Sequence, residues 1–344
     1  MTFLPKIDNP SEPSNFRPIC VSSVFLRAVH KVLANRFLPL LKLSESQVAF
    51  QKRDGVFEAT ATLHSLLRYK IQGAKPLSLA CLDLTKAFDS VSTHSILRAA
   101  VASGAPPPMV RYLSFLYSTS TVTFNEMTLS PGRGVRQGDP LSPLLFLAAL
   151  NEVLERAEPS IGVSFGDSTL SSLAYADDLI LCAESPHYLQ KKLDKLTAAV
   201  ADIGLSLNVE KSFCLHLDAD PYRKKAVFST ELCTIEGKTL RTLGAEDQFK
   251  YLGVSFSPSG LLATPHGRLF HEALQEISDA PLKSHQRLDV LRDFLIPRHL
   301  HTLVLGLVHK QTLRSLDRKI RASIRAWLRL PSDTPLGFFH ASIA

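Results

Sequence analysis

The sequence has few cysteines, and none of the patterns in which cysteine binds metal or forms disulfides. Its five cysteines include no CxxC pair and have no nearby pair of histidines. Neither a zinc module nor a disulfide framework is therefore expected. We interpret all five as buried thiols: Cys20, Cys81, Cys182, Cys214 and Cys233.

The sequence also lacks a segment that could cross a membrane. Its longest apolar run, LSPLLFLAALNEVL, is interrupted by Pro143 and is shorter than the roughly 20 residues that a membrane-spanning helix needs. The opening residues MTFLPKIDNP do not resemble a secretory signal. With no internal repeat and no low-complexity tract, the sequence predicts a cytosolic or nuclear protein without a membrane partner.

What the chain does have is the composition of an ordinary globular protein. Its 344 residues are 45% hydrophobic and 21% charged, which is enough for roughly two to three packed units. The formal net charge of +7 is uneven, because residues 266–330 contain twelve Lys and Arg against six acidic residues. This excess predicts a basic surface near the C-terminal end.

Two acidic clusters stand out because they lie in runs of strand-forming apolar residues. Asp83 lies in LSLACLDLTKAFD, and Asp177 and Asp178 lie in SLAYADDLILCAES. Asp is disfavoured in strands, and half-buried carboxylates need a counter-charge. We therefore expect the clusters to form one site that binds divalent cations, since two Mg²⁺ ions about 3.5–4 Å apart are the usual device for nucleotidyl transfer.

Hydrophobic periodicity and turn residues predict a mixture of helices and strands. The first helix is predicted from Ser23 to Leu43, with Leu26, Val29, Leu33 and Phe37 on its buried face. Further helices are expected at 55–72, 93–104, 141–158, 187–203 and within 282–330. Strands are expected at 77–84, 205–217 and 249–258, a hairpin at 118–136 with turn residues at 130–132, and two short strands that meet at Asp177 and Asp178.

Five motifs occur in the order and spacing typical of one enzyme family: AFD, RQGDPLSP, YADD, GLSLNVEKS and FKYLG. Together they resemble the polymerase motifs of reverse transcriptases. The flanks NFRPICVSSVFLRAVHKVLANR, KYLGVSFSPSG and WLRLPSDTPLGFFHA resemble, more narrowly, non-LTR retrotransposons that insert into ribosomal RNA genes. The DNA-binding fingers, zinc knuckle and endonuclease of such proteins are not found here, so the sequence resembles their central polymerase fragment.

The resemblance implies an α+β right-hand polymerase, with fingers at 1–77, a palm containing an antiparallel sheet at 78–257 and a helical thumb at 258–344. It implies an RNA-directed DNA polymerase that uses an RNA template, a DNA primer or target, dNTPs and two Mg²⁺ ions, with Mn²⁺ as a substitute. Target-primed retrotransposition, and a protein that is made in the cytoplasm and acts in the nucleus, are implied in the same way.

By the resemblance, Asp83 and Asp177 are metal ligands, and Asp178 supports or ligates the second ion. Phe88 stands where RNA polymerases of the palm class usually have a polar residue that accepts the ribose 2′-hydroxyl. An aromatic ring there would clash with that hydroxyl and select deoxynucleotides, although a core Phe would also fit the pattern.

Gln137 and Gly138 are interpreted as contacts to the nascent base pair, because glycine lets the backbone approach closely. Asp139 is interpreted as a helix cap rather than a catalyst. Arg133 and Arg136 are either ligands of template phosphates or exposed charges of a hairpin.

Lys211 interrupts an apolar alternation, where a cation is unexpected. In the family the matching lysine is a candidate acid for the departing pyrophosphate, but a solvated turn at NVEK fits equally. Tyr251, Leu252 and Gly253 match the primer-grip turn, and a plain strand with a bulge at Gly253 is the alternative.

Basic residues near both ends are expected to bind phosphates. Arg17 and Lys6 match the fingers region that clamps the triphosphate, whereas Gln51 stands where many relatives have arginine. In the thumb, Leu313, Leu316, Ile320, Ile324 and Trp327 predict a buried stripe. The opposite face would offer a rail to a duplex backbone, formed by Arg314, Arg318, Arg321 and Arg325.

Two other functional interpretations stay open. The first is a group II intron-type or retron-type reverse transcriptase, which has the same chemistry. The second is a nucleic-acid-binding remnant that has lost catalysis.

Overall fold

A computed structural model describes the chain except for residues 1, 8, 13–14, 125, 158–159, 221, 224, 336 and 341–344. The fold divides into two compact units, Met1–Ala245 and Glu246–Ala344. This division does not test the three-part boundaries at 77 and 257, which stay predictions. Each unit is described separately below.

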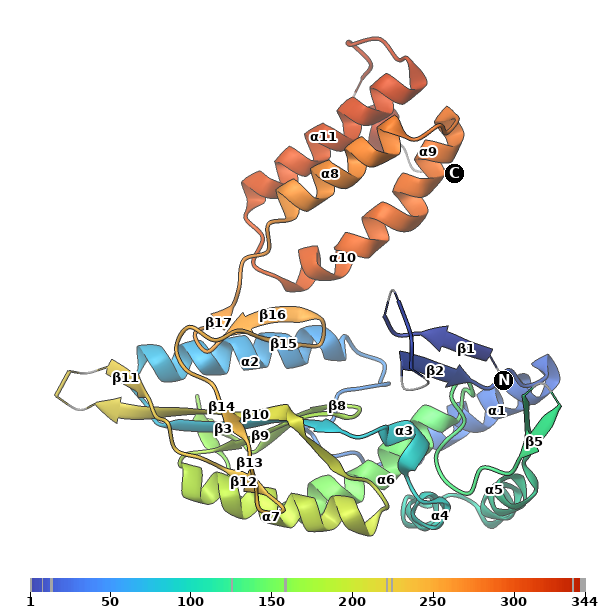
Figure 1. The fold of residues 1–344 in the computed structure, drawn as a ribbon, viewed down its shortest axis with the longest axis vertical. Helices are drawn as coiled ribbons and strands as arrows, with labels where there is room; N and C mark the ends of the chain where they lie inside the picture. The colour runs from blue at the N-terminus through green and yellow to red at the C-terminus, as the bar shows by residue number, and fades with distance from the viewer. Residues whose placement is uncertain are drawn as a thin grey trace. The chain divides into compact units, whose positions relative to one another are not determined.

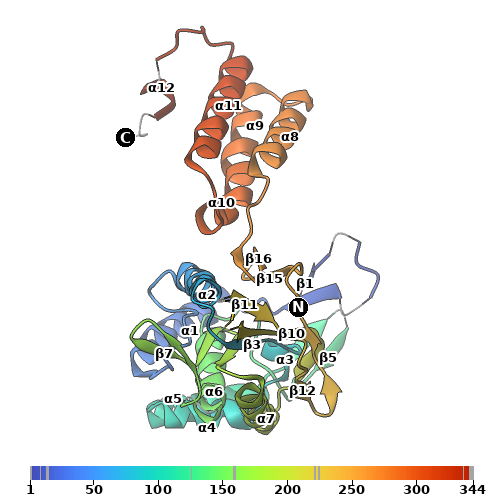
Figure 2. The ribbon, with the colours of Figure 1, turned by 90° about the vertical axis from the view of Figure 1, so that its left-hand side faces the viewer.

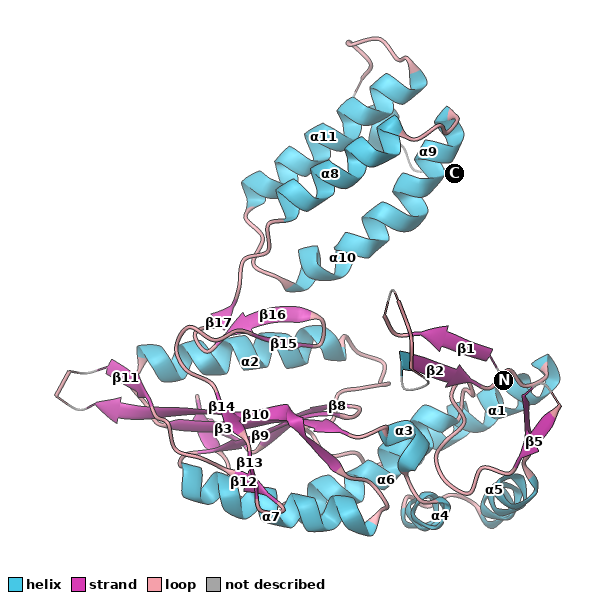
Figure 3. Ribbon diagram, viewed as in Figure 1, coloured by secondary structure: helices cyan, strands magenta, loops and turns pink. Residues whose placement is uncertain are grey.

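A six-stranded sheet forms the centre of the first unit (Figure 3). Its strands lie in the order β11-β10-β3-β9-β8, all neighbours on this path are antiparallel, and β14 pairs with β10 in parallel. The strands are β3 (Leu77–Leu84), β8 (Ser172–Tyr175), β9 (Asp178–Ala183), β10 (Leu207–Asp220), β11 (Lys225–Phe228) and β14 (Arg241–Thr242).

Helices cover both faces of this sheet (Figures 1 and 2). Helix α2 (Gly55–Gln72) lies on one face, and α6 (Ser142–Arg156) and α7 (Pro186–Asp202) lie on the other. Because side chains alternate along a strand, Ala80, Leu82 and Leu84 of β3 enter the core with α6 and α7. By the same alternation, Asp83 lies on the opposite face of β3.

Capping residues explain where several helices begin. Asp54 accepts a hydrogen bond from the Phe57 amide at 3.1 Å and starts α2. Ser92 starts α4 (Thr93–Ala102) and Ser185 starts α7 in the same way. A helix that was not predicted, α5 (Pro107–Thr119), begins within a run of prolines, which are favourable at the first helical position.

The N-terminal region consists of a hairpin and a helix. Strands β1 (Thr2–Pro5) and β2 (Phe16–Ile19) are antiparallel, and α1 (Val24–Phe37) is followed by a 3-10 turn at Leu38–Leu40. The predicted helix 23–43 was therefore too long. On its predicted apolar face, Phe37 is buried and Leu33 packs against the core, but Val29 is exposed. The helix also buries His30 and Ala34.

Short hairpins complete the first unit. In the predicted hairpin at 118–136, β4 (Val122–Phe124) pairs with β5 (Met127–Leu129), so residues 130–132 follow the hairpin and are not its turn. A helical turn, α3 (Ala87–Ser90), follows β3. The other pairs are β6 (Val163–Phe165) with β7 (Ser168–Leu170), and β12 (Thr234–Ile235) with β13 (Lys238–Thr239).

The second unit has a small antiparallel sheet and a helical core. The sheet contains β15 (Phe249–Tyr251), β16 (Val254–Ser257) and β17 (Gly260–Leu261). The helices are α8 (His266–Asp279), α9 (Ser284–Val290), a π-helical segment Leu291–Leu295, α10 (Ile296–Leu305), α11 (Lys310–Leu328) and α12 (Gly337–His340). The helical region therefore begins at residue 266 rather than 282.

The core of the second unit tests the predicted stripe on α11. Leu316 and Trp327 are buried there, and Ile320 and Ile324 pack against it. Leu313 was assigned to the stripe wrongly, because 44% of its surface is exposed. Among the helices that the structure describes, none is long and apolar enough to span a membrane.

Candidate functional site

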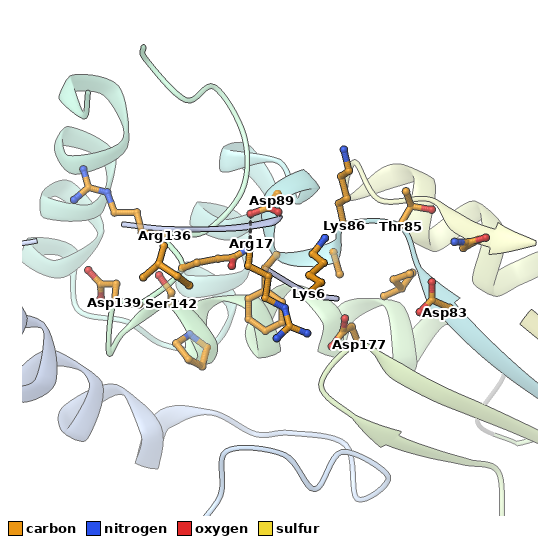
Figure 4. A pocket seen from close by; sticks show the side chains of 18 of the residues that line it. Lys6, Arg17, Asp83, Thr85, Lys86, Asp89, Arg136, Asp139, Ser142 and Asp177 are labelled. Atoms are coloured by element: carbon orange, nitrogen blue, oxygen red, sulfur yellow. Dashed lines mark hydrogen bonds between the residues drawn. The ribbon is translucent and has the colours of Figure 1, made fainter. Parts of the chain in front are cut away.

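A cavity of 690 Å³ in the first unit collects most of the residues that the motifs single out (Figure 4). It is lined by Asp83, Phe88, Asp177 and Lys211, together with Arg17. These residues come from β2, β3, α3, the turn after β8 and β10. The fold therefore joins segments that are up to about two hundred residues apart in the chain.

Strand register brings the acidic clusters together. Leu82 pairs with Leu179, so Asp83 and Asp178 are the next residues in that register and lie on the same face of the sheet. Asp177 lies in the tight turn between β8 and β9, after Ala176 with φ 52°. The predicted strand pair that meets at these two aspartates is confirmed.

Burial and neighbouring negative charge raise the pKa of Asp177 and Asp178. Partial burial, and then the charges of Asp177 and Asp83, raise the pKa of Asp178 to about 6. Burial, together with Asp83, also raises the pKa of Asp177, and the charge of Arg17 opposes this rise. Such a site gains free energy by binding a cation.

A buried glutamine that the sequence did not point to supports the acidic turn. Gln47 is 1% exposed, and its Oε1 accepts a hydrogen bond from the Ala176 amide at 3.0 Å. Its Nε2 donates to the Ala176 carbonyl at 3.3 Å. Gln47 therefore fixes the backbone immediately before Asp177.

Lys211 reaches the acidic face through an irregularity in β10. The register with β3 shifts between Asn208 and Phe213, which breaks the alternation that made a lysine unexpected. Lys211 Nζ lies 3.9 Å from Asp83 Oδ2, and the side chain is 70% exposed. The Ser212 hydroxyl also accepts a hydrogen bond from the Asp83 amide at 3.1 Å.

Phe88 is at once a wall of the cavity and a packed aromatic. Its ring stacks on Phe146 of α6, with centroids 4.3 Å apart and an interplanar angle of 21°. Packing of this kind fixes the position of the ring. The two interpretations of Phe88 from the sequence, a sugar gate and a core residue, are thus compatible in one position.

The loop with Gln137 and Gly138 is held against the end of β2. The Cys20 amide donates to the Gln137 carbonyl at 2.9 Å, and Gln137 Nε2 donates to Asp89 Oδ1 at 2.7 Å. A Cβ on Gly138 would lie 3.2 Å from the Cys20 carbonyl oxygen, and its φ of 97° also favours glycine. Asp89, which orients the Gln137 amide, was not identified from the sequence.

A buried polar network anchors the same loop. Asp139 Oδ1 accepts from the Leu141 amide at 2.9 Å, and Asp139 Oδ2 pairs with His30 Nδ1. His30 Nε2 lies 2.5 Å from the Tyr112 hydroxyl. Asp139 was predicted to cap the helix; Leu141 occupies the cap position instead, and Asp139 supports the turn before it.

Cations surround the cavity on the side of the first hairpin. Figure 4 shows Lys6 and Arg17 near Asp177. Arg136 also lines the cavity, and its guanidinium donates to the Ser120 hydroxyl. Arg133 lines a neighbouring cavity of 400 Å³ instead.

In the second unit, Tyr251 ends β15, and Leu252 and Gly253 form a two-residue turn into β16. Their φ angles are 48° and 79°, as expected for the turns that favour tight hairpins. His301 Nε2 lies 2.8 Å from the Leu252 carbonyl oxygen and donates to it. The alternative of a strand with a bulge at Gly253 is therefore wrong.

The four arginines of α11 are not equivalent. Arg314 and Arg318 are exposed. Arg321 Nη2 lies 2.6 Å from Asp317 Oδ2, and Arg325 Nη2 donates to the Thr334 carbonyl at 3.1 Å. Of the four arginines predicted to form the rail, only Arg314 and Arg318 are therefore exposed on the part of α11 that the structure describes.

The donor set at the acidic site fits divalent cations. Asp83 and Asp177 line one cavity, and carboxylate oxygens are the ligands that Mg²⁺ and Mn²⁺ prefer. Burial, followed by neighbouring carboxylates, raises the pKa of Asp177 and Asp178, so a bound cation would favour their charged forms. A cavity in which Asp83 and Asp177 lie beside the cations Lys6, Arg17 and Lys211 suits the chemistry of nucleotidyl transfer.

Comparison with known proteins agrees with this class. Residues 4–256 match the family model described as reverse transcriptase (RNA-dependent DNA polymerase). The chain is 38% identical to a Pol polyprotein from the type-1 retrotransposable element R2 of Nasonia vitripennis, over 99% of this chain and 34% of that protein. It is 36% identical to the corresponding protein of the type-2 element R2DM of Drosophila melanogaster, over 98% of this chain and 32% of that protein.

The chain belongs to the reverse transcriptase family, whose members share the right-hand polymerase fold, use divalent metal ions and bind a nucleic-acid template and dNTPs. It spans about a third of the length of the two retrotransposon relatives. Among solved structures, apo telomerase from Candida tropicalis is similar over 88% of this chain and 55% of that chain, at 12% identity and a TM-score of 0.48.

Proposed function

We propose that this chain catalyses RNA-templated addition of deoxynucleotides to a primer 3′-hydroxyl, with release of pyrophosphate. The observation that carries the proposal is that Asp83, Asp177, Phe88 and the Gln137–Gly138 loop line one cavity. Membership of the reverse transcriptase family supports the same reaction.

In this proposal Asp83 and Asp177 hold two Mg²⁺ ions, with Mn²⁺ as a substitute, and Asp178 supports the second. When bound, the ions neutralise the triphosphate and lower the pKa of the 3′-hydroxyl. Lys211 is the candidate donor of a proton to the departing pyrophosphate, which its position 3.9 Å from Asp83 supports. Arg17, together with Lys6, binds the triphosphate oxygens.

The remaining roles concern the sugar and the duplex. Phe88 excludes the ribose 2′-hydroxyl, and Gln137 and Gly138 contact the nascent base pair. Arg136 is proposed to hold template phosphate. In the second unit, the turn 251–253 contacts the primer, and the α11 arginines contact the duplex backbone, with Arg314 and Arg318 better exposed for this than Arg321 and Arg325.

We further propose fingers at 1–77, a palm at 78–257 and a thumb at 258–344. The biological role is proposed to be target-primed retrotransposition, by a protein made in the cytoplasm and acting in the nucleus. The names of the retrotransposon relatives support this role.

Primer extension tests the reaction. The chain should extend a DNA primer on an RNA template with dNTPs and Mg²⁺, and Asp177→Ala should reduce extension to background. Asp167→Ala, which changes an exposed aspartate of the β6–β7 turn, is the matched control. Full activity in Asp177→Ala would contradict the metal-site assignment, and template binding without extension by the unmodified chain would favour the non-catalytic remnant.

The sugar gate needs a separate experiment. Phe88→Ala should accept rNTPs that the unmodified chain rejects, because the ring no longer meets the 2′-hydroxyl. Phe115→Ala is the aromatic control, since Phe115 is 66% exposed on α5. Equal discrimination against rNTPs in both variants would show that Phe88 serves only the core.

A further inference from the structure

A cluster of metal-binding side chains lies on the face of the sheet opposite the acidic site. Cys214 pairs with Ala80, and His216 pairs with Ser78, so both face α6 and α7 with Ala80, whereas Asp83 faces the other way. Cys233, which precedes β12, completes the cluster. All three residues are buried, and their ligand atoms lie within 4.8 Å of one another.

The spacing of the donors suits a tetrahedral ion. Cys233 Sγ lies 3.7 Å from His216 Nε2. Zinc binds sulfur at about 2.3 Å and imidazole nitrogen at about 2.0–2.1 Å, so tetrahedral geometry separates the two donors by about 3.6 Å. The observed separation therefore leaves these two donors almost where zinc requires them.

Neighbouring groups orient the donors. His216 Nδ1 lies 3.0 Å from the Ser78 hydroxyl, and a partner on one ring nitrogen directs the other nitrogen toward the ion. The backbone fixes the approach of Cys233 to β10, because the Leu243 amide donates to the Cys214 carbonyl and the Leu240 amide donates to the Cys233 carbonyl, each at 2.8 Å. The cluster is thus preorganised by groups outside it.

The chemistry of the donors selects the ion. Thiolate sulfur and imidazole nitrogen are the ligands of zinc, not of Mg²⁺. A buried thiolate is costly without a positive partner.

We propose that Cys214, His216 and Cys233 form a structural zinc site that ties the segment after β11 to β10. Three protein ligands leave one position of a four-coordinate ion to a further ligand. From the sequence no zinc module was expected, because the ligands follow no CxxC or paired-histidine pattern; the fold unites them.

Metal analysis of the whole chain tests the site. The chain is expressed with added Zn²⁺, purified with a tag that contains no histidine, and analysed by mass spectrometry for metals. We expect about one zinc per chain, as for a structural site, and at least about a tenfold lower content in Cys214→Ala and Cys233→Ala. Cys182→Ala, which removes an equally buried thiol of β9 outside the cluster, should keep its zinc.

Cobalt supplies a second readout that does not depend on activity or on the folding of a variant. Co²⁺ added to the unmodified, metal-stripped chain should give thiolate-to-metal charge-transfer bands and the visible bands of tetrahedral coordination. A folded chain that takes up neither Zn²⁺ nor Co²⁺, or zinc content equal in the unmodified chain and in folded Cys233→Ala, would overturn the proposal.

Discussion

Replacing His30 with leucine is expected to destabilise the first unit by about 3 kcal/mol. The ring is 0% exposed and joins Asp139, which is 6% exposed, to the Tyr112 hydroxyl. Removing one partner of a buried hydrogen bond costs about 1–3 kcal/mol, because the other partner stays buried without compensation. We take the upper end, since Asp139 and the Tyr112 hydroxyl both lose this partner, although Asp139 keeps its hydrogen bond from the Leu141 amide at 2.9 Å.

Urea unfolding followed by far-UV circular dichroism measures this cost. With a slope of about 3 kcal/mol per molar urea, the midpoint of the first unit should fall by about 1 M. The single tryptophan, Trp327, belongs to the second unit, so its fluorescence follows that unit separately. Separate probes are needed because a chain of two units need not unfold in one step.

Two further variants make the interpretation specific. Tyr112→Phe removes only the hydroxyl and should cost about 1 kcal/mol. Arg98→Met breaks an exposed pair, in which Arg98 Nη2 lies 2.8 Å from Glu152 Oε2, and should cost at most about 1 kcal/mol. If His30→Leu shifts the midpoint no more than Arg98→Met does, the buried network does not anchor the loop, and the reasoning fails.

Three other predictions concern the acidic site, the loop and α11. Because the pKa of Asp178 is raised to about 6 in the folded chain, the metal-free protein should lose stability as pH rises through about 6. Below about pH 6, Mg²⁺ affinity should fall up to about tenfold per pH unit. Asp178→Asn should abolish the pH dependence of stability, measured by melting, and that of Mg²⁺ affinity, measured by titration. Gly138→Ala should lower the free energy of unfolding by about 1–2 kcal/mol and raise the KM for dNTPs, because Gly138 has a positive φ and lies close to the Cys20 carbonyl. Gly132→Ala is the control: a Cβ there would lie in open space, so neither the melting temperature nor the KM should change. In duplex binding, Arg318→Gln should reduce the magnitude of the slope of log affinity against log salt concentration by about one. Arg321→Gln should reduce it less, because the Arg321 charge is already paired with Asp317. Equal slopes in the unmodified chain and both variants would contradict a role for α11.

Local patterns predicted the elements that carry the site. The helix at 55–72 and the strand at 77–84 have the predicted bounds, because an apolar periodicity, an Asp cap and a bounding turn agree there. The bend at Asp177 and Asp178 was predicted for the same reason. Each acidic motif could thus be placed at a strand end or a bend from residues within about ten positions of it. That the two motifs form one site was expected from the chemistry of their carboxylates.

The supporting residues could not be predicted, because their partners are distant in sequence. His30 meets Asp139 109 positions away, Gln137 meets Asp89 48 positions away, and Ser212 meets the Asp83 amide 129 positions away. No local pattern distinguishes a buried histidine from an exposed one, so Val29 rather than His30 was assigned to the apolar face of α1. Lys211 was puzzling for a similar reason, since a register shift in a strand depends on the partner strand.

The two faces of the central sheet lead to opposite expectations for metal removal. On the acidic face, a metal-free site holds carboxyl groups whose pKa values are raised by burial and mutual repulsion, so the fold persists without the ion and binding mainly relieves repulsion. On the other face, the proposed zinc ligands are buried and hold the segment after β11 to β10.

A chelator selective for zinc should therefore lower the melting temperature while Mg²⁺ is present. Removal of Mg²⁺ alone should stop primer extension. It should change the melting temperature little below about pH 6, where Asp178 is protonated. Because β10 also carries Lys211 beside Asp83, loss of zinc should disturb the acidic face through this strand, without any contact between the ion and the substrate.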